Sequence, residues 1–490
     1  MRNFNSAHEK DLEVLSSFLK VEAINSLNFN DALICAGLYG RLHWDNISGF
    51  FGDDGFEKEL FAKWKHKLPR LSAKEMRGGR PDRWCHVLTR VYSYGGHSRL
   101  FKQLCNGLAD HGISQSLIVT QKATADVLRA LPDHLDAKSV LKGTPEHRAC
   151  AVYKIARTAS TVLLYNHPDD IGTALAARAL REDGVKVLFV NHADHVFSFG
   201  PGAADTVLEI CATGWATSEQ RRSTNAQHFM GIPMVSASAD KIATRYNRSG
   251  PILSIGGPAK YKPTSSLNFP RFLEQLLAVV SNDVVLIGPS KKDPWWADVL
   301  AKYPGRIQLL GIQPSEVVQT EFQRASCYVD SFPMDGGTVF SEAVLNGLPT
   351  FGPNRQSALG ISPADSLRCE GETQLISDVA AYLKGGECSL DLVAVRNRIH
   401  QDFTNLAAVE RVLEAAAGVT KALPDYLTQL GNRGPDYNAH NWRQDAQLHF
   451  PKRAWRKLSL RKKLKIWRSA SHLDLSTSTV KKLKHRIFFG

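Results

Sequence analysis

Short apolar segments alternate with helical segments along most of this chain of 490 residues, and this alternation constrains its fold more than any other feature. The alternation comes in two series, which a polar NRSGP sequence at residues 247–251 separates. Strands that alternate with helices form parallel sheets covered by helices. The first series predicts strands at residues 84–89, 116–119, 161–165, 186–190, about 209–212 and 216–218, and the second at 252–255, 284–287, 307–310, 327–329 and 350–351. We therefore predict an α/β fold with two Rossmann-like domains.

The residues before the first series have a helical pattern. Leu12, Leu15 and Leu19 lie on one apolar stripe, and a glycine-containing turn at residues 50–55 separates a further helix at 56–67. Hydrophobic residues make up 43% of the chain and charged residues 22%, which excludes a disordered or fibrous protein. We predict a helical N-terminal extension over residues 1–83, a first Rossmann-like domain over 84–247, a second over 248–425, and a linker with a basic tail over 426–490.

Almost all of the net charge lies at the C-terminal end. Residues 451–490 contain thirteen Lys or Arg and one Asp, which is +12 of the chain's formal +13. One basic appendage on a nearly neutral protein argues against nucleic acid as a partner. Apolar residues such as Trp455, Ile466 and Trp467 are interleaved with these charges in two clusters. The sequence is therefore consistent with two alternatives for residues 451–490: peripheral contact with an anionic membrane, or a solvated tail.

Cysteine usage and hydropathy indicate the compartment. The eight cysteines are scattered singly, without the paired spacing of zinc or redox sites. The N-terminus lacks the apolar core of a signal peptide, and no run approaches the roughly 18 apolar residues of a membrane span. We expect a cytoplasmic protein, peripheral at the inner face of the membrane if its tail binds lipid.

The sequence DSFPMDGGTVFSEAVLNGLPTFG at residues 330–352 predicts an anion site after a strand. Pro333 ends the strand because it has no amide hydrogen to donate, and Gly336 with Gly337 permits a tight turn. Thr338 is the predicted N-cap of the next helix, whose free amides and positive dipole end would hold a diphosphate. Glu342, one turn later, would accept hydrogen bonds from sugar hydroxyls. An ordinary glycine turn between a strand and a helix is the alternative.

Three polar segments, at residues 95–98, 166–170 and 191–195, follow predicted strands of the first series and should meet at one edge of its sheet. Two of the segments contain His97 and His192, and a carboxylate such as Asp194 can orient an imidazole and raise its basicity. Zinc binding and purely structural histidines are alternatives, and we predict no metal because no further His or Cys cluster accompanies the histidines. For residues 166–170, a turn that caps the next helix is an equal alternative.

Basic and aromatic residues provide further candidates. Lys260 follows the first strand of the second series, where a cation would stabilise the charge of a departing diphosphate, although a surface lysine is equally consistent with the sequence. Arg221 and Arg222 are further candidates for phosphate contact. Trp295 and Trp296 favour packing beneath a loop over stacking on a ligand. The chain lacks the G-x-G-x-x-G fingerprint beside Gly96, which argues against a dehydrogenase.

Residues 330–352 resemble the donor-binding segment of nucleotide-sugar glycosyltransferases with the GT-B fold. Glu342, Ala343, Gly347 and Pro349 match the family sequence E-A-x-x-x-G-x-P. In the large retaining family, a second glutamate lies eight positions earlier, where this chain has Met334. The D-S-F-P and G-G-T sequences are also similar to those of cytosolic protein glycosyltransferases related to O-linked N-acetylglucosamine transferases, which invert. The two resemblances imply opposite stereochemistry.

The resemblance covers residues 84–416 and implies two Rossmann-like domains facing one cleft, the GT-B architecture. It also implies that residues 402–416 form a helix that returns to the first domain. The nucleotide sugar would be a substrate, and neither a cofactor nor a metal would be needed. The implied donor-binding residues are Gly95, Gly96, Lys260, Asp335, Gly336, Gly337, Thr338 and Glu342, and the implied catalytic residues are His97, His192 and Asp194.

The function that the resemblance implies is transfer of a sugar from a nucleotide-diphosphate sugar. The expected acceptor is a cell-surface polysaccharide or lipid-linked glycan, because a basic tail would hold the enzyme near a membrane. A cytosolic protein glycosyltransferase is one alternative, which the absence of tetratricopeptide repeats weakens. A nucleotide-sugar epimerase of the same fold and a non-catalytic scaffold are the others.

Overall fold

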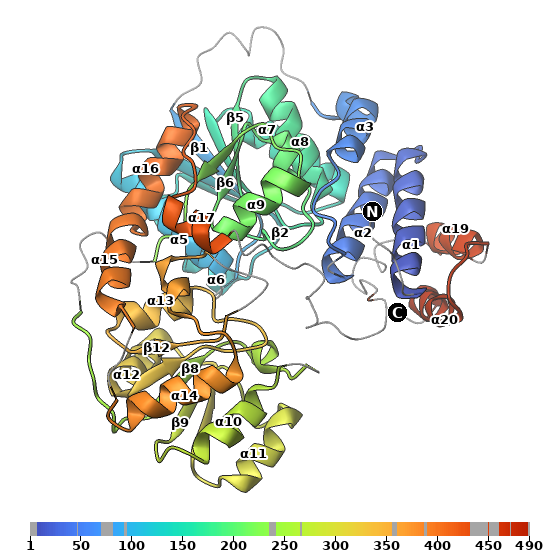
Figure 1. Cartoon of the computed structure of the whole chain (residues 1–490). Helices are drawn as coiled ribbons and strands as arrows, with labels where there is room; N and C mark the ends of the chain where they lie inside the picture. The colour runs from blue at the N-terminus through green and yellow to red at the C-terminus, as the bar shows by residue number, and fades with distance from the viewer. Residues whose placement is uncertain are drawn as a thin grey trace.

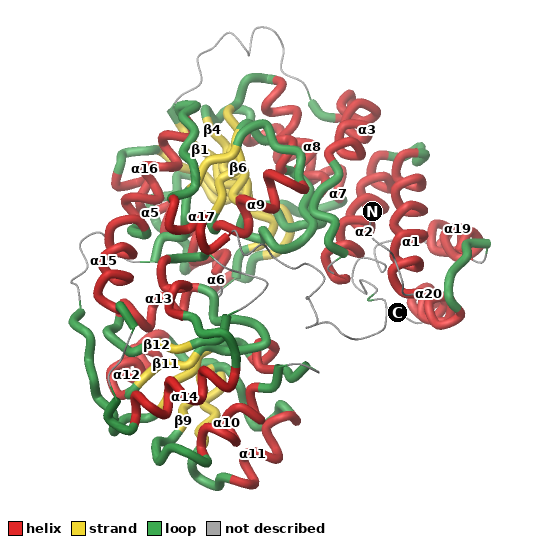
Figure 2. The backbone as a smooth tube through the Cα atoms, viewed as in Figure 1, coloured by secondary structure: helices red, strands yellow, loops and turns green. Residues whose placement is uncertain are grey.

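The computed structural model describes residues 7–46, 48–69, 82–92, 96–234, 242–264, 267–354, 360–386, 390–431, 449, 460–470 and 472–488. Two parallel sheets, each flanked by helices, form two α/β domains, one above the other in Figure 1. Figure 2 shows the strands of each domain enclosed by helices and loops. The predicted α/β class with two Rossmann-like domains is confirmed.

The first sheet has seven strands, all parallel, in the order β3-β2-β1-β4-β5-β6-β7. Central strands β4 and β5 are almost wholly buried, as their apolar sequences require. The chain adds β2 and β3 on one side of β1 and then returns to β4 on the other, so the strand order reverses between β1 and β4. The strands are β1 (Arg83–Arg90), β2 (Ser114–Lys122), β3 (Ala137–Val140), β4 (Thr161–Tyr165), β5 (Lys186–Val190), β6 (Thr206–Glu209) and β7 (Gln227–Phe229).

The second sheet has five parallel strands in the order β10-β9-β8-β11-β12. Its strand order reverses between β8 and β11. In open sheets of this kind, ligands bind beyond the carboxyl ends of the strands at such a reversal. The strands are β8 (Ile252–Ile255), β9 (Val284–Ile287), β10 (Ile307–Gly311), β11 (Cys327–Val329) and β12 (Thr350–Phe351).

Helices cover both sheets (Figure 1). Around the first sheet lie α5 (Gly96–Asp110), α6 (Ala125–Arg129), α7 (Pro145–Ala156), α8 (Ile171–Glu182) and α9 (Ala212–Arg221). The helices of the second domain are α10 (Phe269–Leu277), α11 (Ala297–Lys302), α12 (Ser315–Arg324), α13 (Thr338–Leu345), α14 (Glu372–Leu383) and α15 (Leu392–Asp402), and α17 (Asp425–Gly431) contacts α9.

Helix α16 (Asn405–Ala416) returns to the first domain, as predicted. Its residues Ala408, Val409 and Val412 are buried in the same core as β1 and α5. Gly107 of α5 allows this close approach, because a Cβ atom there would lie 2.6 Å from a methyl carbon of Val409. The two domains are therefore joined by packing near the C-terminal end of the second series as well as by the chain between β7 and β8.

Three helices form the predicted N-terminal extension: α1 (Ala7–Ile24), α2 (Phe29–Asn46) and α3 (Asp54–Trp64). Their apolar side chains share one core with α7, α8 and one face of the first sheet. Within that core, Arg178 of α8 forms buried ion pairs with Asp54 at 2.6 Å and Glu57 at 3.6 Å. The extension is thus packed onto the first domain along an apolar and partly charged interface.

The basic tail forms two helices, α19 (Leu460–Ala470) and α20 (Thr477–Phe488), which lie beside α1 (Figure 1). Ile466 and Leu483 are fully buried against the N-terminal extension. Asp11 of α1 accepts hydrogen bonds from the Ser476 amide at 2.8 Å and the Thr479 hydroxyl at 2.6 Å. The described part of the tail is therefore docked, and a wholly solvated tail is excluded for these residues.

Segments outside the described residues include 451–459 and, apart from Gly431, the predicted link at 431–438. No helix among the described residues combines the length and apolar character needed to cross a bilayer.

Two strand predictions near the end of the first series are wrong. Strand β6 ends at Glu209, so the predicted strand at 209–212 is shifted, and residues 216–218 lie in α9 rather than in a strand. The cause is an N-cap that the sequence pattern does not reveal: the Cys211 sulfur accepts a hydrogen bond from the Gly214 amide at 3.2 Å and starts the helix there. The short edge strands β3 and β7 were also not predicted, and β3 is half-exposed and carries no apolar run.

Candidate functional site

The carboxyl ends of the two sheets are linked by one ion pair between the domains. Arg99 lies in α5, which follows β1, and Glu342 lies in α13, which follows β11. Arg99 Nη1 and Glu342 Oε1 are 2.5 Å apart, although 243 residues separate them in sequence. The segments that follow the strands at both order reversals therefore face the same region of the molecule.

Three histidines gather in the first domain after β1, β4 and β5. The ring centroids of His97 and His192 are 4.3 Å apart, those of His97 and His167 are 5.7 Å apart, and those of His167 and His192 are 6.4 Å apart. Tyr92 stacks on His167 at 6.2 Å, and Trp44 of α2 meets the same ring edge-on at 5.5 Å. The predicted meeting of the three polar segments is confirmed. We call His97, His167 and His192 the histidine cluster.

Burial keeps the histidine cluster uncharged at neutral pH. It lowers the pKa of His97 to about 4 and that of His167 to about 3, where neighbouring His97 and Arg90 add repulsion. Burial, followed by the neighbouring His97 and His167, lowers the pKa of His192 well below its ordinary value. No ring nitrogen of His97 makes a hydrogen bond of good geometry within the described chain, although the nearby Tyr165 carbonyl raises its pKa slightly. The cluster therefore presents neutral imidazoles with unused hydrogen-bonding capacity.

Asp194 pairs with His195, which is not a member of the histidine cluster. Its carboxylate lies 3.2 Å from Nδ1 of His195, which is half-exposed, and accepts a hydrogen bond from the Cys211 thiol at 2.8 Å. Nδ1 of His192 instead lies 3.2 Å from the Val190 carbonyl oxygen. The carboxylate–imidazole pair exists, but it involves the half-exposed His195, whereas His192 is packed against His97 in the histidine cluster. Among the residues that the structure describes, no group of His, Cys, Asp and Glu is arranged to hold a metal ion.

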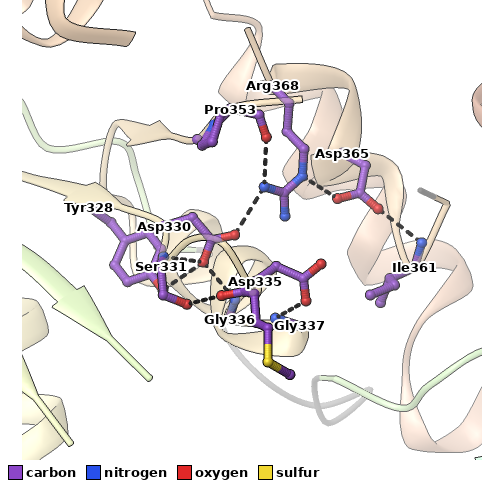
Figure 3. A network of polar contacts seen from close by, with 12 residues as sticks. Tyr328, Asp330, Ser331, Asp335, Gly336, Gly337, Pro353, Ile361, Asp365 and Arg368 are labelled. Atoms are coloured by element: carbon purple, nitrogen blue, oxygen red, sulfur yellow. Dashed lines mark hydrogen bonds and ion pairs between the residues drawn. The ribbon is translucent and has the colours of Figure 1, made fainter. Parts of the chain in front are cut away.

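A buried network of charges and hydrogen bonds underlies residues 330–352 of the second domain (Figure 3). Oδ1 of buried Asp330 accepts hydrogen bonds from the Tyr328 hydroxyl at 3.2 Å and from the Ser331 and Gly336 amides at 3.0 and 2.9 Å. Its other oxygen pairs with Arg368 at 2.9 Å, and Arg368 donates to Asp365 at 2.8 Å. Both charged side chains of the Asp330–Arg368 pair are almost fully buried.

This network corrects the predicted use of the glycine turn. The Gly336 amide donates to Asp330, and the Gly337 amide donates to Asp335 Oδ1 at 3.1 Å, so both predicted diphosphate donors have internal partners here. Gly337, with φ of 63°, is the N-cap of α13, and Thr338 is the first helical residue, whose hydroxyl donates to Glu342 at 3.2 Å. A side chain at residue 336 would clash, since its Cβ would lie 2.5 Å from Asp330 Oδ1.

Two cationic side chains nevertheless lie at the carboxyl ends of the strands of the second sheet. Lys260, which follows β8, donates from Nζ to the Asp335 carbonyl oxygen, and its own carbonyl accepts the Met334 amide. Arg99 approaches from the other domain onto Glu342. Of the predicted donor residues, the structure therefore brings together Lys260, Asp335 and Glu342 with the start of α13. Gly95 lies outside the described residues, and Gly96 is exposed at the first residue of α5.

No family model matches this sequence, and no curated protein matches it. Solved structures do match. The apo form of the lipopolysaccharide outer core galactosyltransferase WaaB is 12% identical, with a TM-score of 0.50 over 69% of this chain and 99% of that one. A glycosyltransferase from Rickettsia africae ESF-5 is 11% identical, with a TM-score of 0.52 over 69% and 98%. Anabaena Alr3699/HepE in complex with UDP is 12% identical, with a TM-score of 0.52 over 69% and 100%.

The fold is GT-B. At 11–12% identity the likeness establishes the fold alone. The match covers 69% of this chain and nearly the whole of each neighbour, so about a third of this GT-B protein has no counterpart in them.

Several other candidates have structural roles in this GT-B chain. Arg222 is buried and donates to the carbonyl oxygens of Asp194 and Val196 at 2.8 Å each, so it does not face a phosphate. Arg221 lies over the ring of Phe51. Trp296 is fully buried in the core of the second domain, which confirms the packing interpretation.

The 166–170 segment combines both predicted alternatives. Asp170 caps α8 and accepts hydrogen bonds from Thr89 at 2.8 Å and Thr120 at 2.6 Å, while His167 joins the histidine cluster. The turn that starts the helix therefore also positions a ring at the sheet edge.

Three contributors were not assigned a role from the sequence: Arg99, Arg368 and Trp44. Arg99 lies three residues after Gly96, and its position in the first turn of a helix at a strand-order reversal was the one available signal. Arg368 lies 38 residues after its partner Asp330 in no recognisable motif. Trp44 belongs to the N-terminal extension, which sequence patterns alone do not connect to the site.

Proposed function

We propose that this protein transfers a sugar from a nucleotide-diphosphate sugar to an acceptor. The observation that carries the proposal is the pairing of Arg99 with Glu342, which joins the strand ends of two Rossmann-like domains beside the histidine cluster. Neighbours of the same fold support it, because Alr3699/HepE is solved with UDP and with UDP-glucose. We therefore propose a uridine nucleotide as the donor's leaving group.

In this proposal the second domain binds the donor. Lys260, Arg99 and the positive end of α13 would stabilise the negative charge of the departing diphosphate, which is the main electrostatic demand of the reaction. Glu342 would exchange its contact with Arg99 for hydroxyl groups of the donor and release the guanidinium toward the phosphates. These cations support a hexosyl transfer that needs neither a bound metal nor a cofactor.

The histidine cluster would act on the acceptor side. As a bond forms between the acceptor oxygen and the sugar carbon, the bond to the diphosphate breaks and the acceptor loses its proton. His97 and His192 are neutral and can accept that proton, and a diphosphate bound nearby would raise their pKa values toward the range useful for a base. Asp194 would act through His195 at the rim of this region.

The acceptor that we propose is a cell-surface polysaccharide or a lipid-linked glycan, reached at the cytoplasmic face of a membrane. The apolar side of α19 packs against the protein, whereas Arg461, Lys481 and Lys484 of α19 and α20 are exposed. These charges would attract anionic lipid at about 1 kcal/mol for each Lys or Arg near the surface. Membrane contact in this proposal is electrostatic and peripheral.

Donor binding is the first test. We expect a UDP-sugar, compared with GDP-, ADP- and CMP-sugars, to raise the melting temperature of the purified chain and to bind in calorimetry, because a ligand specific to the native state stabilises it. Glu342→Ala should reduce the affinity at least tenfold. Glu316→Ala, an exposed glutamate in the first turn of α12, should leave it unchanged. Folded protein that binds none of the four sugars would contradict the proposal.

Turnover is the second test. Release of nucleoside diphosphate that increases with an added glycan acceptor, together with a product enlarged by one sugar, is the expected result. Conversion of the nucleotide sugar to its epimer without an acceptor would instead identify an isomerase.

A further inference from the structure

The N-terminal extension reaches the histidine cluster through α2. Trp44 meets the ring of His167 edge-on, with centroids 5.5 Å apart. The guanidinium of Arg41, one turn earlier, lies over the Trp44 ring at 4.1 Å and is 4.0 Å from Asp169. Helix α2 therefore supplies side chains to the same sheet edge that the three histidines occupy.

A pocket lies between α2 and the start of α8, next to that contact. It is open to solvent, and its walls come from α2, the ends of β2 and β4, and the first turns of α7 and α8. Leu33, Ile34 and Leu38 form an apolar wall on α2, and Gln121, Arg148 and Asp169 are polar lining residues. One apolar wall with a few polar groups is typical of a small-molecule site.

Helix α2 is fitted closely to the loop that bears these polar groups. A Cβ atom at Gly37 would lie 3.3 Å from the carbonyl oxygen of Asp169, so a glycine keeps α2 near the loop. The neighbouring Asp170 is fully used as the cap of α8 and as acceptor for Thr89 and Thr120. Asp169 instead has a long contact with Arg41, and burial raises the pKa of its carboxyl group.

We infer that α2, Trp44 and this pocket form an acceptor subsite that binds a neutral sugar residue. The inference rests on the proposed function and names the substrate class on its acceptor side. The rings of Trp44 and the exposed Tyr92 lie beside His167, although Arg41 covers one face of Trp44 and His167 one face of Tyr92. Aromatic rings at such a position suit the apolar face of a sugar ring. Asp169 and Gln121 can accept hydrogen bonds from hydroxyl groups. The lining holds two carboxylates, Asp169 and Asp170, against one guanidinium, that of Arg148, so its charge favours a neutral sugar over an acidic sugar or a phosphate.

The position of the pocket fits that use. Asp169 is two residues from His167, and His167 lies in ring contact with His97 and His192, the proposed proton acceptors. A glycan held in the pocket would thus extend toward the cluster, and Arg99 with Glu342 would present the donor from the opposite side. The extension becomes one wall of the site.

The test measures acceptor binding separately from donor binding. Saturation-transfer NMR of the full chain without donor would use methyl glycosides of glucose, galactose, mannose and N-acetylglucosamine, with methyl glucuronide as the acidic comparison. At least one neutral glycoside should bind and the glucuronide should not. Trp44→Ala and Asp169→Asn should each weaken that binding at least fivefold. Phe50→Ala, which removes an exposed aromatic side chain from the same extension, should not alter it.

Thermal shift by UDP-sugars in the same variants separates the two proposals. Trp44→Ala and Asp169→Asn should retain the wild-type donor shift within about twofold in affinity, which also shows that they are folded. Equal glycoside binding by wild type and both variants would overturn the inference, as would preference for the glucuronide or transfer to a polypeptide with no glycoside binding. If no UDP-sugar raises the melting temperature of the wild type, the proposed function itself is wrong.

Discussion

The two strand edges that face each other in this protein are built in opposite ways. In the second domain, Asp330 and Arg368 are buried charges whose hydrogen bonds are largely satisfied within the protein. In the first domain, the histidine cluster is buried but neutral, and its rings contact one another more than they make hydrogen bonds. The comparison indicates that one edge is a rigid support for a turn and the other has capacity left for a ligand.

The physical reason lies in the cost of burying charge. A buried ion pair is tolerated only when each partner keeps its counter-charge and hydrogen bonds, so the Asp330–Arg368 network has one satisfactory arrangement. A neutral imidazole costs much less to bury and can change its protonation when a charged ligand arrives. The rigid edge positions Glu342 and the start of α13, and the adaptable edge is suited to proton movement.

The largest effect that we expect is on the rigid edge. Asp330→Asn should lower the free energy of unfolding by about 3–5 kcal/mol, because it leaves the buried Arg368 without one of its two carboxylate partners. Urea denaturation at pH 7.5 measures the loss. Asp335→Asn is the matched control, since asparagine can still accept the Gly337 amide, and it should cost less than about 1 kcal/mol. Equal small losses in both variants would show that the network is not a rigid support.

The adaptable edge should matter for rate rather than for folding. His97→Ala should lower kcat for sugar transfer at least about a hundredfold, the lower end for removal of a general base, with a melting temperature close to that of the wild type. His111→Ala, which changes an exposed histidine directly after α5, should change kcat less than threefold. A large loss in His195→Ala with none in His97→Ala would move the proton acceptor to the Asp194–His195 pair.

Acid should destabilise the histidine edge selectively. Burial lowers the pKa of His97 to about 4, below the ordinary value of 6.5. As the pH falls below 6.5, the unfolded chain therefore binds a proton at this residue before the folded protein does, and the free energy of unfolding decreases. Between pH 7.5 and pH 5 this one group should cost about 2 kcal/mol. His97→Gln should lose that part of the pH dependence in denaturation experiments, and an unchanged profile would contradict the burial of a neutral ring.

The smallest effect should come from the contact that joins the two edges. Arg99 is half-exposed, so Arg99→Ala should reduce stability by less than about 1 kcal/mol, far less than the loss expected at Asp330. Donor affinity in calorimetry should nevertheless fall severalfold, since the variant removes a cation from the proposed diphosphate site. A variant that loses several kcal/mol of stability would show that the ion pair holds the domains together instead.

Local sequence predicted much of the framework. The strands at 161–165, 186–190, 252–255 and 284–287 were placed residue for residue, because runs of apolar and β-branched residues bounded by turns leave few alternatives. The sheet edge shared by the histidine segments followed from the same argument, since parallel strands present their carboxyl ends together. Where the signal was a single unusual cap, as at Cys211, the prediction failed.

The sequence by itself determined the alternation of strands and helices, the two domains, and the placement of His97, His192 and Glu342 after strands. These depend on periodicity and turn chemistry within about twenty residues. Only the tertiary structure decided that Gly336 donates to Asp330, that Arg99 meets Glu342 across 243 residues, and that α2 borders the histidine cluster. Such pairings are set by packing and by the burial of charge among segments far apart in the chain, which no local pattern records.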